Sequence, residues 1–259
     1  MIVLFVGDVV GRPATEWLVE RIPQLRRKHD AGLVVVNAEN SGEDGFGPTC
    51  AMVDMLHDAG ADVVTGGNHS WDSPDAVAAL NRPWVLRPLN FAPGVPGIGI
   101  LTVQVGGDPV TVVNLGDQCA MRSARGVAHK FMPAFPCWLT ADRTGTVLVD
   151  YHGEHVIEKQ IFAHTVDGTA AAVLGTHTHE PTLPLRILPS GTALVTDVGM
   201  TGPTGGVQGF TAANFVTGLT REGNPFHPPL PVPADGPLTL GAVLVEVEGG
   251  KATRLERLT

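Results

Sequence analysis

The stretch "IVLFVGD" at residues 2–8 is a continuous apolar run that ends in glycine and aspartate. Such a run predicts a strand that is buried on both faces, as in sheets that helices cover on each side. Residues 12–30 then carry apolar side chains at helical spacing, with Pro13 where a first helical turn tolerates it. We expect Pro23 to kink or divide this helix.

The strand-then-helix cycle is repeated over the first third of the chain. Residues 32–40 and 61–72 predict two further buried strands that end in polar residues, and residues 49–60 and 73–81 predict helices. The last of these helices has a serine cap and a proline in its first turn. This alternation predicts βαβ units with parallel pairing, and therefore an α/β fold.

From about residue 83 onward, hairpins join the pattern. Residues 97–117 predict two strands that are connected by a Gly-Gly-Asp turn. The other expected elements are a strand at 146–154, a helix at 154–168, a strand at 170–179 and hairpin-like strands at 185–200 and 238–258. Residues 224–237 are expected to form a long surface loop, a candidate interface in a homo-oligomer. No repeat or linker divides the sequence, so we predict one domain over residues 1–259.

The composition disfavours several classes of protein. The chain has 17 Lys and Arg against 26 Asp and Glu, and its formal net charge of −9 disfavours binding to nucleic acid polymers. Three cysteines without CxxC spacing argue against a disulfide framework and against a thiolate zinc site. The apolar run at the start is too short to cross a bilayer and has no basic region before it. We therefore expect a cytoplasmic protein without a membrane partner.

Polar side chains follow five of the predicted strands at their carboxyl ends. These are Asp8, then Asn37, Glu39 and Asn40, then Asn68 and His69, then His152 and Glu154, and finally His177 and His179. In open α/β sheets the site lies outside the carboxyl ends of the strands, so these residues are candidates for one site. A single polar residue at a strand end is common, and for Asn37 we favour a turn-forming role.

The donor groups in this set suit a metal centre. Carboxylate, amide and imidazole groups without thiolate favour zinc, iron or manganese over a structural cysteine site. His177 and His179 would point to the same face of an extended segment, because strand side chains alternate with a period of two. There are enough candidates for two ions that share a bridging carboxylate. The other histidines are expected at the surface or in packing roles: His29, His57, His129, His155, His164 and His227.

At these residues the sequence resembles the calcineurin-like metallophosphoesterase superfamily, and more narrowly the bacterial YmdB-type phosphodiesterases. The motifs follow the order of that family: "GDVVGRP" at 7–13, "NAEN" at 37–40, "GGNHSWD" at 66–72, "YHGE" at 151–154, "GTHTH" at 175–179 and "TDVGMTGP" at 196–203. The broad superfamily has D-x-H in its first motif and an aspartate as the bridge. Here Asp8 is followed by two valines and Glu39 stands in place of that aspartate, and both departures fit the YmdB-type subgroup.

The resemblance implies a four-layer αββα fold, in which two mixed sheets lie between helices. It implies two divalent or trivalent metal ions, with iron favoured over manganese or zinc. The implied ligands form two sets that share one bridging carboxylate: Asp8, Glu39, Asn40 and His179 for one ion, and Glu39, Asn68, His152 and His177 for the other. His69 would face the substrate and protonate the leaving oxygen or stabilise the transition state.

The implied activity is hydrolysis of a small phosphodiester by a metal-bridging hydroxide, with a 2′,3′-cyclic nucleotide as the favoured substrate. Two alternatives stay open: a phosphomonoesterase with the same site, and a regulator that binds metal and nucleotide without turnover. Dinucleotide binding is disfavoured, because the segment from Gly7 to Gly11 lacks the GxGxxG fingerprint. An amidohydrolase barrel is disfavoured because its HxH pair closes the first strand, whereas here the pair comes late.

Overall fold

The apolar run at the start of the chain forms β1, which lies in the middle of the first sheet of the computed structural model. The structure describes residues 1–258. The order of strands in this sheet is β13-β12-β1-β2-β3, and β1 pairs in parallel with β2 and antiparallel with β12. Its strands are β1 (Ile2–Val6), β2 (Ala31–Asn37), β3 (Val63–Thr65), β12 (Ala242–Glu248) and β13 (Lys251–Leu258).

The second sheet has the order β4-β5-β6-β7-β9-β8 and is also mixed. Its strands are β4 (Ile100–Val105), β5 (Asp108–Gly116), β6 (Thr146–His152), β7 (Ala172–Thr176), β8 (Arg186–Ile187) and β9 (Ala193–Val195). The predicted hairpin at 97–117 is β4 and β5, which are joined through Gly106 and Gly107 at positive φ angles. A separate short pair is formed by β10 (Gly202–Pro203) and β11 (Leu238–Thr239).

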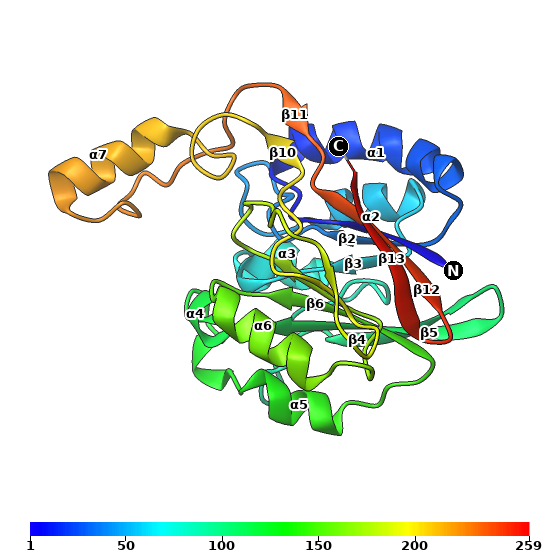
Figure 1. The fold of residues 1–259 in the computed structure, drawn as a ribbon. Coiled ribbons are helices and arrows are strands. Elements are labelled where there is room, and N and C mark those ends of the chain that lie inside the picture. The colour runs from blue at the N-terminus through cyan, green and yellow to red at the C-terminus, as the bar shows by residue number, and fades with distance from the viewer. Residues whose placement is uncertain (259) are drawn as a thin grey trace.

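Helices cover the outer faces of both sheets. In Figure 1, α1 (Gly11–Lys28) and α2 (Cys50–Asp58) lie above the first sheet, and α5 (Ala134–Thr140) and α6 (Val156–Thr165) lie below the second. The remaining helical elements are η1 (Asn68–Trp71), α3 (Pro74–Ala79), α4 (Gln118–Met121), η2 (Ala128–Lys130) and α7 (Ala212–Glu222). The implied four-layer fold with two mixed sheets is therefore confirmed.

Three clusters of buried apolar side chains lie between the four layers of helices and sheets. Each cluster fills the space between two neighbouring layers. Because side chains alternate along a strand, β1 sends Val3 and Phe5 into the cluster between the sheets, and Leu4 and Val6 into the cluster under α1 and α2. The third cluster packs the second sheet against α5 and α6 and includes Trp138 and Phe162. The buried apolar run thus fixes β1 as a strand that is covered on both faces.

The expected division of the first helix at Pro23 is wrong. Helix α1 continues through Pro23 for 18 residues, so Pro23 does not divide it. The helix buries Leu18 and Ile22 completely against the first sheet, and this packing offsets the hydrogen bond that proline cannot donate. The predicted cap of the later helix is confirmed, because the Ser73 hydroxyl accepts a hydrogen bond from Ala76 N.

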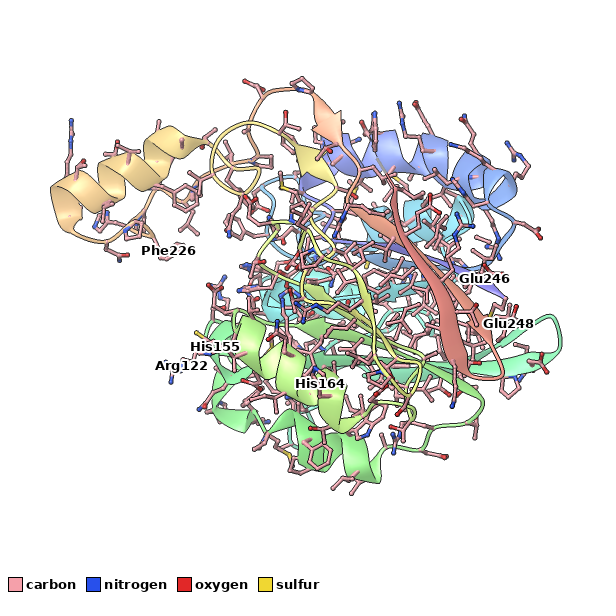
Figure 2. All side chains as sticks on the ribbon, in the orientation of Figure 1. Arg122, His155, His164, Phe226, Glu246 and Glu248 are labelled. Carbon is pink, nitrogen blue, oxygen red and sulfur yellow. The ribbon has the colours of Figure 1, made fainter. Side chains whose placement is uncertain are left out.

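Residues 204–237, hereafter the arm, carry α7 away from the layered body (Figure 1). Helix α7 was not among the expected elements, and Gly218 is its buried residue. The expected surface loop at 224–237 is the return segment of the arm, where Phe226 is 66% exposed and lies away from the body (Figure 2). Among residues 1–258, no helix has both the length and the apolar character needed to cross a membrane.

Candidate metal centre

The carboxyl ends of β1, β2, β3, β6 and β7 meet at one edge of the two sheets. The backbone N–H of His177, after β7, donates to both carboxylate oxygens of Asp8, after β1, at 3.2 Å. His152, the last residue of β6, lies 3.0 Å from Glu39, which follows β2 in the other sheet. The structure brings together all of the predicted site residues: Asp8, Glu39, Asn40, Asn68, His69, His152, His177 and His179.

The first set of donors, hereafter the His152 group, comprises Glu39, Asn68, His152 and His177. Nε2 of His152 lies 3.0 Å from Glu39 Oε1 and 3.1 Å from Asn68 Oδ1. It also lies 3.0 Å from Nδ1 of His177. Ligands that bind one ion at about 2.1 Å lie about 3.0–3.4 Å apart, so these spacings suit a shared cation. Donor atoms of Glu39, His152 and His177 all lie within 4.8 Å of one another.

The second set, hereafter the His179 group, comprises Asp8, Asn40 and His179. Nε2 of His179 lies 3.3 Å from Asn40 Oδ1 and 4.0 Å from Asp8 Oδ1. His179 Nδ1 donates to the carbonyl of Gln208 at 2.8 Å, and Asn40 Nδ2 donates to that of Gly45 at 2.7 Å. These bonds leave the lone pairs of His179 Nε2 and Asn40 Oδ1 facing each other, as ligands to one cation would be.

Gly67 leaves room where any side chain would enter the centre. A Cβ atom at this position would lie 2.1 Å from Glu39 Oε2 and 2.3 Å from His152 Nε2. Since only glycine lacks this atom, the chain keeps the space beside the carboxylate and the imidazole open. With the donor spacings, this open space shows that the residues fit a bound metal ion.

The backbone of the "GTHTH" segment differs from the expected extended strand. Strand β7 ends at Thr176, and His177 and His179 have φ angles of 98° and 63°. The reason is Asp197, whose carboxylate accepts hydrogen bonds from the N–H of Thr178 at 2.9 Å and from its hydroxyl at 2.8 Å. Positive φ at non-glycine residues costs about 1–3 kcal/mol each, and this clamp stabilises it. As a result, the two imidazoles enter different groups.

Buried carboxyl groups are crowded together at the centre. Burial, with repulsion from Asp197 and Glu39, raises the pKa of Asp8 to about 8. Burial opposes ionisation of Glu39, but His152 and His177 hold the pKa of Glu39 well below its ordinary value. Burial lowers the pKa of His152 to about 4, which favours the neutral imidazole. A neutral imidazole beside crowded carboxylates is the electrostatic setting of a cation site.

His69 lies beside the two groups and is oriented by an aspartate. Its N–H donates to Glu39 Oε2 at 3.3 Å, and its ring Nδ1 lies 2.5 Å from Asp72 Oδ2. Burial opposes the charged imidazole, but the hydrogen bond to Asp72 and the charge of Glu39 raise the pKa of His69. Asp72 was not predicted, although its spacing of three residues places it on the same side of η1 as His69.

Several residues outside the implied ligand sets support the centre. The turn-forming role favoured for Asn37 is confirmed, because its Oδ1 accepts from the N–H of Glu39 at 3.1 Å, as in an Asx turn. Its donation to buried Asp150 at 2.9 Å was not predicted. Glu154, which is 3.2 Å from His177 Nε2, holds the outer side of that ring. Asp197 follows β9 as the other polar residues follow their strands, so the same pattern could have found it.

The remaining histidines lie apart from the centre, as expected. His155 and His164 are exposed on and beside α6 (Figure 2). His57 stacks on Trp84 with the ring centroids 3.9 Å apart. The three cysteines, Cys50, Cys119 and Cys137, are free thiols. These residues provide matched positions for control variants.

Comparison with known proteins supports the same family as the motifs. Residues 4–258 match the family model described as "YmdB-like protein". The chain is 36% identical over 265 residues to the 2′,3′-cyclic-nucleotide 2′-phosphodiesterase of Bacillus subtilis (strain 168), which covers 100% of this chain and 96% of that protein.

Two solved structures share the fold over nearly the whole chain. A hypothetical protein from Thermus thermophilus gives a TM-score of 0.88 at 34% identity and covers 98% of this chain and 97% of that one. A novel phosphatase of Mycoplasma pneumoniae gives a TM-score of 0.86 at 30% identity, and the match covers 99% of this chain and 92% of that one. The chain therefore belongs to the YmdB-like protein family, as its motifs predict.

Proposed function

We propose that this protein is a metal-dependent phosphodiesterase whose substrate is a 2′,3′-cyclic nucleotide. The observation that carries the proposal is the convergence of five strand ends on a buried set of oxygen and nitrogen donors beside Gly67. The substrate class follows the name of the relative from Bacillus subtilis, which aligns with the whole chain.

We assign two metal positions to the centre. Glu39, Asn68, His152 and His177 would hold one ion, and Asp8, Glu39, Asn40 and His179 would hold the other. Glu39 would be the shared carboxylate: its Oε1 lies 3.0 Å from His152 Nε2 in one group, and its charge raises the pKa of Asp8 in the other. When bound, the ions would supply an acidified water as nucleophile and neutralise charge on the phosphoryl oxygens, a role that iron, manganese and zinc all suit.

We assign His69 as the general acid for the leaving oxygen. Its Nδ1 is held by Asp72, so Nε2 is the ring nitrogen left to meet the substrate. The same aspartate stabilises the protonated ring, which is the form that can donate a proton. Phe46 packs edge-on against this ring with the centroids 5.0 Å apart and limits its rotation.

The proposal is tested by steady-state turnover of 2′,3′-cyclic and 3′,5′-cyclic nucleotides by the wild type and by His69→Ala. The expected result is preference for the 2′,3′-cyclic substrate and a loss of about 10²–10⁴-fold in His69→Ala at unchanged metal content. His164→Ala is the matched control, because this exposed histidine lies on α6. Full activity of His69→Ala would contradict the role of His69 as general acid. A wild-type protein that hydrolyses none of these phosphoesters would contradict the proposed enzymatic activity.

A phosphomonoesterase is the second candidate, because the Mycoplasma pneumoniae structure with TM-score 0.86 is described as a phosphatase. The same donors can hold a terminal phosphate as readily as a diester. Aryl phosphate and bis-aryl phosphate compared at equal concentration separate the two activities. Faster hydrolysis of the monoester would favour the phosphatase.

A further inference from the structure

A buried carboxylate outside the candidate ligand set, Asp150, lies beneath the centre. It is on β6, two residues before His152, and is fully buried. Its Oδ1 accepts from the Thr176 hydroxyl at 2.7 Å, and its Oδ2 accepts from the Thr65 hydroxyl at 2.5 Å and from Asn37 Nδ2 at 2.9 Å. The three donors belong to β7, β3 and β2, so one carboxylate joins both sheets at the site edge.

The hydroxyl of Thr176 links this carboxylate to His152. A threonine hydroxyl has one proton to donate, and Thr176 uses it on Asp150. His152 Nδ1 lies 2.9 Å from the same hydroxyl oxygen, so this ring nitrogen must be the donor there. The ring proton of neutral His152 is then on Nδ1, and the lone pair of Nε2 faces Glu39 and Asn68.

The other neutral tautomer of His152, with the proton on Nε2, would find a hydrogen-bond acceptor within the centre. If the Thr176 hydroxyl were free to donate to Nδ1, the ring proton would reside on Nε2. Glu39 Oε1 lies 3.0 Å from Nε2 and would accept that proton. His152 would then have no lone pair for a metal ion on this side. The hydrogen bond from Thr176 to Asp150 therefore determines the state of His152 Nε2. With this bond, Nε2 has a free lone pair for a metal ion; without it, Nε2 donates a hydrogen bond to Glu39.

The same carboxylate also orients the segment that carries Glu39. Asn37 donates Nδ2 to Asp150, which turns its Oδ1 toward the backbone N–H of Glu39 at 3.1 Å. An amide in the opposite orientation would place two donors against each other at Glu39 N. One buried group thus sets the orientation of two neighbouring parts of the His152 group.

We propose that Asp150 is a positioning residue that fixes the Nδ1–H tautomer of His152 through Thr176 and aligns the Glu39 segment through Asn37. Its importance for turnover rests on the proposed function, in which His152 binds metal. The tautomer itself is a property of the chain, so it can be measured without metal or substrate.

The test is the ¹⁵N chemical shift of the His152 ring nitrogens in the full-length, metal-free protein, assigned by loss of the signal in His152→Gln. Wild type is expected to show an unprotonated Nε2. Asp150→Asn is expected to move the ring proton to Nε2, because the new amide can donate to Thr176 and free its hydroxyl. Thr176→Val should do the same, and Thr176→Ser should retain the wild-type tautomer.

Thr65→Val is the matched control for Thr176→Val. Both remove one hydroxyl donor from Asp150, but only Thr176 touches His152. Metal titration should show about 10–100-fold weaker binding in Thr176→Val than in Thr65→Val. An unchanged tautomer in both Asp150→Asn and Thr176→Val, or an equal change in Thr65→Val, would overturn the proposal. Absence of phosphoester turnover in wild type would overturn the proposed function and leave the tautomer result standing.

Discussion

The His152 group and the His179 group differ in how closely their donors are held and in what holds them. In the His152 group, three donor atoms lie within 3.1 Å of one imidazole nitrogen. In the His179 group, the corresponding distances are 3.3 and 4.0 Å. His152 is anchored by Thr176 on β7, whereas His179 is anchored by the carbonyl of Gln208 at the base of the arm.

The difference shows that His152 is positioned by the strands of the second sheet, whereas His179 is positioned by loops. Donors on sheets are positioned more accurately than donors on loops. We therefore expect the His152 position to bind metal more tightly than the His179 position. The loops around His179 could adapt to an ion, at a cost in affinity.

The largest effect is expected from Glu39→Gln, which removes the carboxylate that the two groups are proposed to share. Both ions should be lost and turnover should fall by more than about 10³-fold, because the charge that holds the cations is gone. Metal analysis and kcat measure the two effects. Retention of both ions in this variant would show that Glu39 is not a bridge.

The next effect separates the groups. His177→Ala should deplete the His152 position and His179→Ala the His179 position, so each variant keeps roughly one of two ions. Metal content and spectroscopy of the remaining ion distinguish the two cases. Loss of the same ion in both variants would mean that the two histidines serve one position.

A smaller effect is expected from Asp72→Asn, which touches neither group. The amide cannot stabilise protonated His69 as the carboxylate does, so kcat should fall about 10²-fold at unchanged KM and metal content. The basic limb of the pH–rate profile should shift to lower pH. Asp58→Asn, at an exposed position on α2, is the control. An equal loss of kcat in Asp58→Asn would contradict the role of Asp72 in stabilising protonated His69.

The smallest effect is in the pH dependence of stability without metal. The pKa of Asp8 is raised to about 8 and that of His177 to about 10, so both contribute stability that is lost as pH rises through those values. Between pH 6.5 and 8, the Tm of metal-free protein should fall by a few °C, since 1 kcal/mol corresponds to roughly 2–4 °C at this size. Asp8→Asn should flatten this slope, and a rising Tm in wild type would contradict the charges assigned.

Much of the fold and the residues of the centre could be predicted from the sequence, because both depend on local patterns. Buried strands are continuous apolar runs, and the polar residues that follow them at a parallel edge must converge. The motif order then implied how Asp8, Glu39 and the histidines divide between two ions.

The rest depends on contacts between distant residues. The turn of the "GTHTH" segment is fixed by Asp197, 19 positions beyond Thr178. The amide of Asn37 also donates to Asp150, which is 113 positions away on the other sheet. Helix α1 continues through Pro23 because the sheet beneath it buries Leu18 and Ile22. No local pattern reports these partners. Helix α7 differs, because Phe215, Val216 and Leu219 stand at helical spacing and could have marked it from the sequence.

The central claim is that two metal positions lie at this edge, one in each group and joined by Glu39. Anomalous X-ray diffraction from crystals of the metal-loaded protein tests it most directly. Two peaks are expected, one among Glu39, Asn68, His152 and His177 and one among Asp8, Glu39, Asn40 and His179, with the higher occupancy in the His152 group. A single peak, or peaks away from these residues, would contradict the account.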